Sequence, residues 1–174
     1  MRYQKYIIMN SKILFSERQT FRQQPWMWLF LAALATGMIA LPFVLCRSAE
    51  NSEDLVALLF VETVFAALAV FFMVGRLDTM ITKEGVSIKF FPLNRSFRLY
   101  RWGDISKAEV VKYSVFESKS LGIKYNAKGA LSYHIGGNKG LRLELTKGRK
   151  LFIGTQKAEE LEAILYKIGQ LSYK

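Results

Sequence analysis

Two apolar runs decide the fold of this chain: PWMWLFLAALATGMIALPFVLC at residues 25–46 and LVALLFVETVFAALAVFFMVG at residues 55–75. A helix needs about 20 residues to cross the hydrocarbon core of a bilayer, and each run has about this length. The link between them, residues 47–54, is short and polar. The pattern predicts a transmembrane helical hairpin. The alternative is a buried helix pair in a soluble domain, but helices in small soluble domains are rarely apolar on every side for this length.

The distribution of charge predicts the orientation of the hairpin. The chain has a formal charge of +11, and the two runs contain one charged residue, Glu62. Residues 1–24 carry five Lys or Arg residues against one Glu, whereas residues 47–54 carry one Arg against three acids. Because cytoplasmic loops are enriched in Lys and Arg, we expect both termini in the cytoplasm and the link on the outer side.

Glu62 is the candidate functional residue inside the membrane. It lies eight residues after Asp54, which places it about 12 Å below the outer surface at about 1.5 Å per residue. We expect Thr36, at a comparable depth on the first helix, to be its partner. Such a carboxyl is costly, so two interpretations stay open: a proton or cation relay, and a protonated carboxyl that bonds across the hairpin or between subunits. The second is favoured, because the two runs supply no other charged residue for a relay.

Residues 1–24 form a basic segment before the first helix. The spacing of Ile13, Phe15 and Phe21 fits a short strand or an interfacial segment better than a helix. Arg18 and Arg22 either contact acidic lipid headgroups or act as orientation signals only.

Residues 77–174 predict a separate β-rich domain. Short runs of alternating apolar and polar residues are separated by glycines, and the clearest is Leu141–Leu145, whose three leucines share one side. Residues 157–171 change to a helical period with an apolar stripe, early acids and late lysines. The fold class is therefore α+β: the hairpin, then a pleckstrin-homology-like (PH-like) barrel or sandwich that a C-terminal helix caps.

Several motifs carry a resemblance to a known group of proteins. They are residues 15–21 before 25–28, then 122–125, 133–137, 140–145 and 153–156. In this order the chain resembles small bacterial two-span membrane proteins of unknown function that have a cytoplasmic PH-like domain. The resemblance implies a bacterial inner membrane, and it supplies no catalytic or ligand-binding residues.

The sequence offers no catalytic constellation. His134 is the only histidine and Cys46 the only cysteine, so we expect a structural role for His134 and no intramolecular disulfide. The glycines at residues 136–140 lack the spacing of a phosphate-binding loop. We therefore predict a protein that is not an enzyme, with no cofactor and no metal.

Basic residues are the remaining candidates for binding. Besides Arg18 and Arg22, the candidates for contact with an anionic membrane surface are Lys83, Lys89, Arg98 and Arg101. The hairpin at Lys83 and Lys89 lacks the dense cluster that specific headgroup recognition needs. Binding to nucleic acid is not expected, since the aromatic residues are explained as core or rim.

These observations predict a non-enzymatic inner-membrane protein. Its two-helix anchor presents a basic PH-like module that binds a protein partner or the membrane surface, as a subunit or a homo-oligomer. The alternative is a small transport or channel component that uses Glu62.

Overall fold

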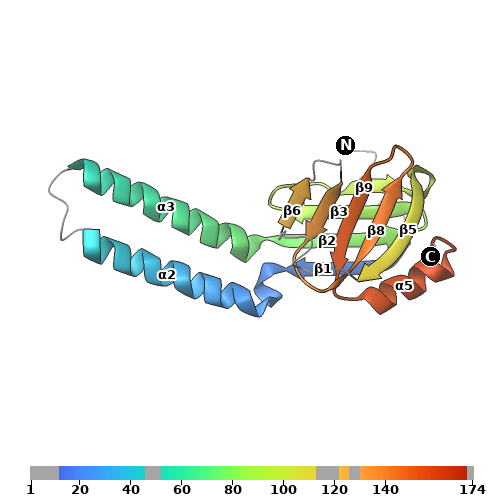
Figure 1. Cartoon of the computed structure of the whole chain (residues 1–174), viewed down its shortest axis with the longest axis horizontal. Coiled ribbons are helices and arrows are strands. Elements are labelled where there is room, and N and C mark those ends of the chain that lie inside the picture. Colours follow the sequence, from blue (N-terminus) through green and yellow to red (C-terminus); the bar gives the residue numbers. More distant parts are fainter. Residues whose placement is uncertain (1–11, 46–51, 113–121, 126–129, 172–174) are drawn as a thin grey trace. The chain divides into compact units, whose positions relative to one another are not determined.

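A computed structural model describes residues 12–45, 52–112, 122–125 and 130–171. The chain forms two compact units, one made of residues 21–75 and the other of residues 1–20 together with 76–174. Figure 1 shows their helices and strands.

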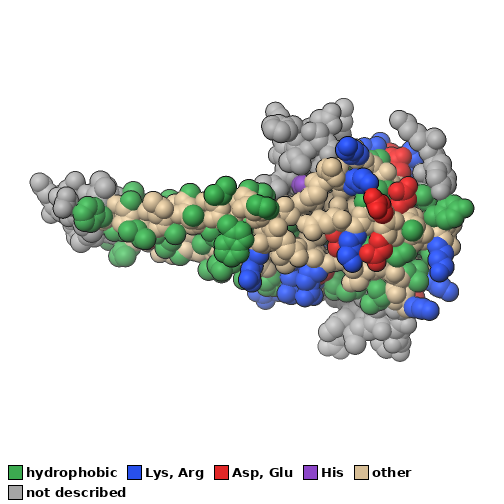
Figure 2. Space-filling view, turned by 90° about the horizontal axis from the view of Figure 1, so that it is seen from below, with side chains coloured by type: hydrophobic (Ala, Val, Ile, Leu, Met, Phe, Trp, Pro, Cys, Tyr) green, Lys and Arg blue, Asp and Glu red, His purple; other side chains and the backbone are tan. Residues whose placement is uncertain are grey.

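The first unit is a pair of helices, α2 (Pro25–Leu45) and α3 (Ser52–Val74), preceded by a short 3₁₀ helix, η1 (Phe21–Gln23). Two stretches, Pro25–Phe43 and Val56–Val74, are long and apolar enough to cross a membrane. Their apolar side chains are largely exposed, Leu29 and Ile39 to 76% and Phe60 to 70%, and Figure 2 shows hydrophobic side chains along the surface of these helices. This exposure is the opposite of what a buried helix pair in a soluble core would have.

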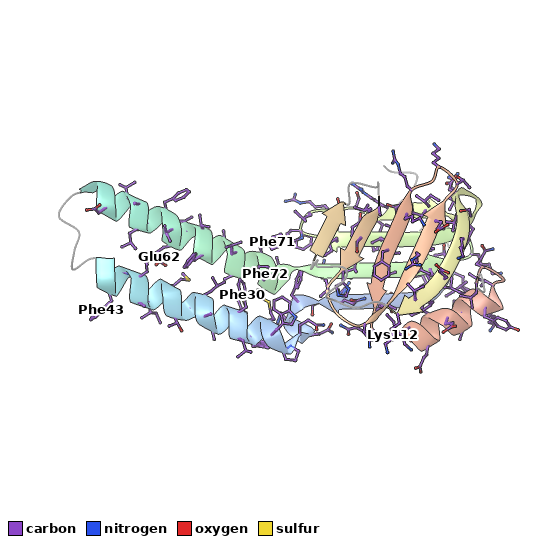
Figure 3. All side chains as sticks on the ribbon, in the orientation of Figure 1. Phe30, Phe43, Glu62, Phe71, Phe72 and Lys112 are labelled. Atoms are coloured by element: carbon purple, nitrogen blue, oxygen red, sulfur yellow. The ribbon has the colours of Figure 1, made fainter. Side chains whose placement is uncertain are left out.

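An aromatic cluster holds the two helices together at the end where the chain enters and leaves them. Phe21 is 1% exposed and packs edge-on against Phe72, with ring centroids 5.3 Å apart, and Phe30 packs against the same ring at 5.1 Å. Figure 3 shows Phe30 and Phe72 between the helices. The Phe21 amide donates to the Gly75 carbonyl at 3.4 Å. The close packing requires glycine at position 75, because a Cβ there would lie 2.6 Å from the Phe21 ring.

The second unit is a sandwich of two sheets. The first sheet contains β1 (Ile13–Thr20), β2 (Arg76–Thr82), β3 (Gly85–Phe91) and β4 (Arg98–Arg101), in this order and antiparallel. The second has the order β5-β8-β9-β7-β6. Its strands are β5 (Ile105–Lys112), β6 (Gly122–Tyr125), β7 (Leu131–His134), β8 (Lys139–Leu145) and β9 (Lys150–Thr155), and η2 (Trp102–Asp104) precedes them. The two sheets are stacked with their strands crossing (Figure 1).

The C-terminal helix, α5 (Ala158–Lys167), contacts β1, β5 and β8. Leu161 and Leu165 are at most 1% exposed, as the predicted apolar stripe requires. The sandwich buries apolar residues from strands of both sheets. In the first sheet these are Phe15, Leu77, Ile81, Val86, Ile88 and Phe90, and in the second Tyr133, Leu141, Leu143, Leu151 and Ile153. The predicted PH-like sandwich with a capping C-terminal helix is confirmed.

The boundaries of the PH-like unit differ from the predicted 77–174. β1 pairs with β2 along its length, from Phe15 opposite Ile81 to Thr20 opposite Arg76. Residues 13–20 are therefore the first strand of the sandwich and not part of a separate segment 1–24. The helical hairpin is an insertion between two neighbouring strands, and sequence alone misses this because the pairing joins residues that lie on either side of both helices.

Two polar side chains of β1 connect the two sheets. The Glu17 carboxylate, 6% exposed, accepts from the Thr155 hydroxyl at 2.5 Å and from the Gln156 amide at 2.8 Å. Gln19 donates to the Gly154 carbonyl at 2.7 Å. These bonds tie β1 to the end of β9 just before α5, so the strand that leads into α2 is anchored in the body of the sandwich.

Candidate basic site on the first sheet

Three cations share the outer face of the first sheet at one of its ends. The strand register sets Arg18, Asp78 and Lys89 side by side, and Arg76 lies between Thr20 and Phe91 in the next row. Alternate residues of a strand point to the same face, so the four side chains of Arg18, Arg76, Asp78 and Lys89 belong to one surface. This is the end at which β1 stops and β2 starts.

Asp78 organises these cations. Its side chain is 6% exposed, and its two oxygens face two guanidinium groups, Arg18 Nε at 2.6 Å and Arg76 Nε at 3.6 Å. The Arg18 and Arg76 side chains remain 64% and 36% exposed. One carboxylate therefore positions two arginines without neutralising them both.

The turn between β3 and β4, residues 92–97, extends from the same end of the sheet. It contributes Arg95, which is exposed. Two aromatic rings beside the turn lie under cations: the Arg76 guanidinium is 5.0 Å from the centroid of Phe91, and Lys89 Nζ is 5.6 Å from that of Phe97. Such contacts hold a cation in place at an exposed site while leaving its charge available. We call Arg18, Arg76, Lys89 and Arg95 the basic edge; with Asp78 as the nearby acid, it has an excess of positive charge.

Comparison with known proteins gives one match. The family model of the bacterial PH domain matches residues 14–169. The chain belongs to this family. The match begins inside β1 and ends beyond α5, so it supports a PH domain that includes the strand before the hairpin. No curated protein and no solved structure gives a match.

The PH domain does not bring all the predicted basic residues together. Arg18 and Lys89 lie on the basic edge, whereas Lys83 is in the turn between β2 and β3 and Arg101 pairs with Gly85 beside that turn. The seven residues of β2 span about 20 Å at roughly 3.3 Å each, which exceeds the Debye length of about 8–10 Å. Lys83 and Arg101 therefore lie apart from the basic edge. Arg22 is exposed and lies in η1 of the other unit.

Arg98 lies beside the basic edge, since it is exposed and its guanidinium donates to the Asn94 side chain in the β3–β4 turn at 3.5 Å, but it also reaches the sandwich. It pairs with Ile88, on the inner side of the sheet, and interacts with the hydroxyl of Tyr133 next to Tyr100. Burial raises the pKa of the Tyr133 hydroxyl, and Tyr100 raises it further while Arg98 opposes the shift. Arg98 thus supports a buried polar group at the margin of the sandwich, a role that its sequence position does not reveal.

Within the hairpin, Thr36 is not the partner of Glu62. The Thr36 hydroxyl donates to the Ala32 carbonyl of its own helix at 2.9 Å. The contacts Phe30–Phe72 and Gly37–Phe65 set a register in which Glu62 lies near the level of Ala40 and Leu41, about four residues from Thr36. Glu62 is three residues before Phe65, so the two side chains lie on the same side of α3.

The Glu62 carboxyl faces an apolar stretch of α2. Its Oε1 atom is buried and has no hydrogen-bond partner within the described part of the chain. In the antiparallel hairpin both neighbours at its level are apolar, so the predicted bond across the hairpin to Thr36 does not form.

The surroundings of His134 indicate a structural role. It is 1% exposed and packs on Gly154 of the neighbouring strand, where a Cβ would lie 2.5 Å from Nδ1 of the imidazole. Burial lowers its pKa to about 4, so the ring is neutral at neutral pH. Among the described residues, no group of three or more His, Cys, Asp or Glu side chains converges as a metal site would require.

Arg76 and Asp78 are the residues of this site that sequence reasoning missed. Arg76 lies just before residue 77, where the sequence pattern predicts the domain to start, and Asp78 reads as an ordinary strand residue. The signal that could have found them is the alternation Leu77–Thr79–Ile81, which places Arg76 and Asp78 together on the opposite face.

Proposed function

We propose that this protein is a non-enzymatic inner-membrane protein of bacteria whose PH domain binds the anionic membrane surface through the basic edge. The helices α2 and α3 span the bilayer, with both termini in the cytoplasm. Of the two classes of partner that the sequence leaves open, a protein and the membrane surface, the geometry favours the membrane surface.

The lengths of the helices support the anchor. Each apolar stretch has 19 residues, which at about 1.5 Å per residue is close to the roughly 30 Å of a hydrocarbon core. The excess of Lys and Arg before α2 and of acids in residues 47–54 supports the orientation.

The observation that carries the proposal is the position of the basic edge on the strands. Arg76 is the first residue of β2, and the single residue Gly75 separates it from the end of α3. Arg18 is two residues from the end of β1. Chain connectivity alone therefore keeps these cations within a few residues of the membrane boundary. A Lys or Arg near an anionic leaflet contributes about 1 kcal/mol of attraction.

The test compares two matched pairs of charge removals in the full chain, reconstituted in nanodiscs. Lys89→Gln/Arg95→Gln removes two charges of the basic edge that form no ion pair with another described residue, and Lys83→Gln/Arg101→Gln removes two charges at the far end of the sheet. The measurement is hydrogen–deuterium exchange of residues 85–101, in discs of phosphatidylcholine with or without phosphatidylglycerol.

We expect the anionic lipid to slow exchange of the β3–β4 turn in the wild-type protein and in the far-end pair. The basic-edge pair is expected to lose this protection, and high salt is expected to remove it from the wild-type protein and the far-end pair. Exchange that ignores lipid charge in the wild-type protein would refute membrane-surface binding and leave a protein partner as the function of the module.

The transport alternative rests on one observation, the buried Glu62 Oε1 atom without a hydrogen-bond partner among the described residues. A lone carboxyl between two helices is a weak basis for an ion path, because a path needs further polar groups along its length. The Glu62→Gln experiment below decides between this alternative and the proposal.

A further inference from the structure

The β3–β4 turn presents an exposed aliphatic side chain beside the basic edge. Most large apolar side chains of the PH domain are buried in the sandwich core. Among its described residues, three are largely exposed: Ile13 at 49%, Leu93 at 60% and Tyr166 at 66%. Leu93 is the one in a tight turn, where the Asn94 amide donates to the Phe90 carbonyl at 2.7 Å.

The strand register limits how far Leu93 can be from the end of α3. Arg76 follows Gly75 directly and is the cross-strand partner of Phe91. Partners in an antiparallel pair have Cα atoms about 4.5–5.5 Å apart, and two further residues add at most about 3.8 Å each. The Cα atom of Leu93 is therefore within roughly 13 Å of that of Arg76, wherever the rest of the PH domain lies.

The surroundings of Leu93 have the composition of an interfacial anchor. Phe91 and Phe97 flank the turn, each with a cation over its ring, Arg76 and Lys89 respectively. Arg95 is exposed on the turn itself. Apolar side chains that enter the acyl boundary beside Lys and Arg at headgroup level are the arrangement by which peripheral segments bind anionic bilayers.

We propose that the β3–β4 turn inserts Leu93 into the cytoplasmic leaflet, as a third point of membrane contact besides the two helices. The occupant of this surface is lipid: Leu93 enters at the boundary between headgroups and acyl chains, and Arg95 binds the anionic headgroups. This inference rests on the proposed membrane anchoring and extends it from attraction by charge to insertion of a named side chain.

The experiment uses the full chain in nanodiscs that contain phosphatidylglycerol, with an environment-sensitive fluorophore on a single cysteine. Cys46 is the only native cysteine, so Cys46→Ser is the background. Leu93→Cys and Ser96→Cys report on the turn, and the second keeps Leu93 in place. Lys83→Cys is the control at the far end of the sheet, and Met73→Cys, on an exposed position near the end of α3, is the control for the anchor.

We expect lipids with a spin label near the headgroup to quench the Leu93→Cys probe about threefold more strongly than the Lys83→Cys probe. The Ser96→Cys probe is expected to lose about half of its quenching when Leu93→Ser is added, because the turn then lacks its apolar side chain. Thermal unfolding of the labelled proteins is the control for an intact fold, and we expect these exposed positions to leave it unchanged.

Two results would contradict insertion of Leu93 but would still be consistent with a membrane anchor formed by α2 and α3. One is strong quenching of Met73→Cys with Leu93→Cys and Lys83→Cys equally weak. The other is a blue-shifted Leu93→Cys probe that the lipid quencher does not reach, which indicates contact with protein, such as a second copy. Failure of the anchor itself gives a different pattern, in which Met73→Cys is also unquenched.

Discussion

Thr20 and Arg76 are direct cross-strand partners in β1 and β2, although both apolar helices lie between them in the sequence. The helical hairpin therefore occupies the position of a loop between two adjacent antiparallel strands. Neither end of it has a long linker, because one residue separates α3 from β2 and four separate β1 from α2. The chain thus enters and leaves the hairpin at neighbouring points of one sheet.

Gly75 is expected to be intolerant of any side chain. In Gly75→Ala the new Cβ would lie 2.6 Å from the Phe21 ring and 3.1 Å from the Phe71 carbonyl. Phe21 cannot yield easily, since it is 1% exposed against Phe72 and Trp26. Overpacking of this kind costs about 1–3 kcal/mol. Thermal unfolding in detergent, followed by near-UV circular dichroism of the aromatic cluster, measures the loss.

The matched control for Gly75 is Gly103→Ala, where a Cβ meets nothing within 4 Å. The two variants remove the same glycine flexibility from the unfolded chain. Equal melting temperatures for both variants would mean that the hairpin end is not closely packed.

Glu17 is expected to stabilise the sandwich through the segment that leads into α5. Glu17→Ala leaves the buried Thr155 hydroxyl and the part-buried Gln156 amide without their acceptor. An unsatisfied buried group costs about 1–3 kcal/mol, so we expect a lower midpoint of urea unfolding and faster amide exchange in the first turn of α5. The control is Glu159→Ala, because that side chain is 94% exposed.

A double-mutant cycle between Glu17→Gln and Thr155→Val isolates the pair. We expect a coupling free energy of about 1 kcal/mol or more, as for contacting residues in one hydrogen-bond network. Additive effects of the two changes would contradict a direct bond.

Glu62→Gln separates the anchor from the transport alternative. Glutamine keeps the size of the side chain and its hydrogen bonding but cannot ionise. Under the proposed function, vesicles that contain the variant and vesicles that contain the wild-type protein are expected to hold an imposed proton gradient equally long. A gradient that collapses faster with the wild-type protein, with both proteins assembled normally, would favour a relay through Glu62.

His134 is expected to make the stability of the PH domain fall in mild acid. Burial lowers the pKa of its imidazole to about 4 in the folded protein, against about 6.5 in the unfolded chain. Above the unfolded value the ring is neutral in both states and stability is flat. As the pH falls toward about 4, the unfolded chain binds the proton first, which lowers the free energy of unfolding by up to about 3 kcal/mol.

Urea unfolding of the full chain between pH 4 and pH 7.5 measures the free energy of unfolding as a function of pH. The same profile is measured for His134→Gln, and subtracting it removes the contribution of carboxylates that titrate in the same range. The difference between the two profiles is expected to flatten above about pH 6.5. A difference independent of pH would show that the imidazole is not desolvated.

The two apolar helices, the strand at Leu141–Leu145 and the C-terminal helix follow from local pattern, and the structure confirms them. Leu29 and Phe60 each belong to a continuous apolar run of about 20 residues, which is enough by itself to indicate a spanning helix. In Leu141–Leu145, five consecutive residues show the alternation of apolar and polar side chains that is typical of a strand. β1 was ambiguous, because Phe15 and Phe21 are spaced as in a strand but Glu17 and Gln19 point inward with Phe15. Polar residues on an inward face contradict the usual alternation, and their partners Thr155, Gln156 and Gly154 lie at the other end of the chain.

The basic site shows the same limit. Composition identifies Arg18 and Lys89 but does not distinguish them from Lys83 and Arg101, which lie at the far end of the same sheet. Thr36 was assigned to Glu62 on depth alone, whereas the register of the hairpin, set by Gly37 on Phe65, places the two at different levels.

The sequence by itself determined the two apolar helices, the β-rich class of the remainder and the excess of positive charge, because each depends on residues close together in the chain. Only the tertiary structure decided that β1 belongs to the PH domain, that Asp78 holds Arg18 and Arg76, and that Phe91, two residues before Leu93, pairs with Arg76 at the start of β2. These relations depend on strand pairing across the inserted hairpin, and that pairing is selected by burial of the whole core rather than by any local run of residues.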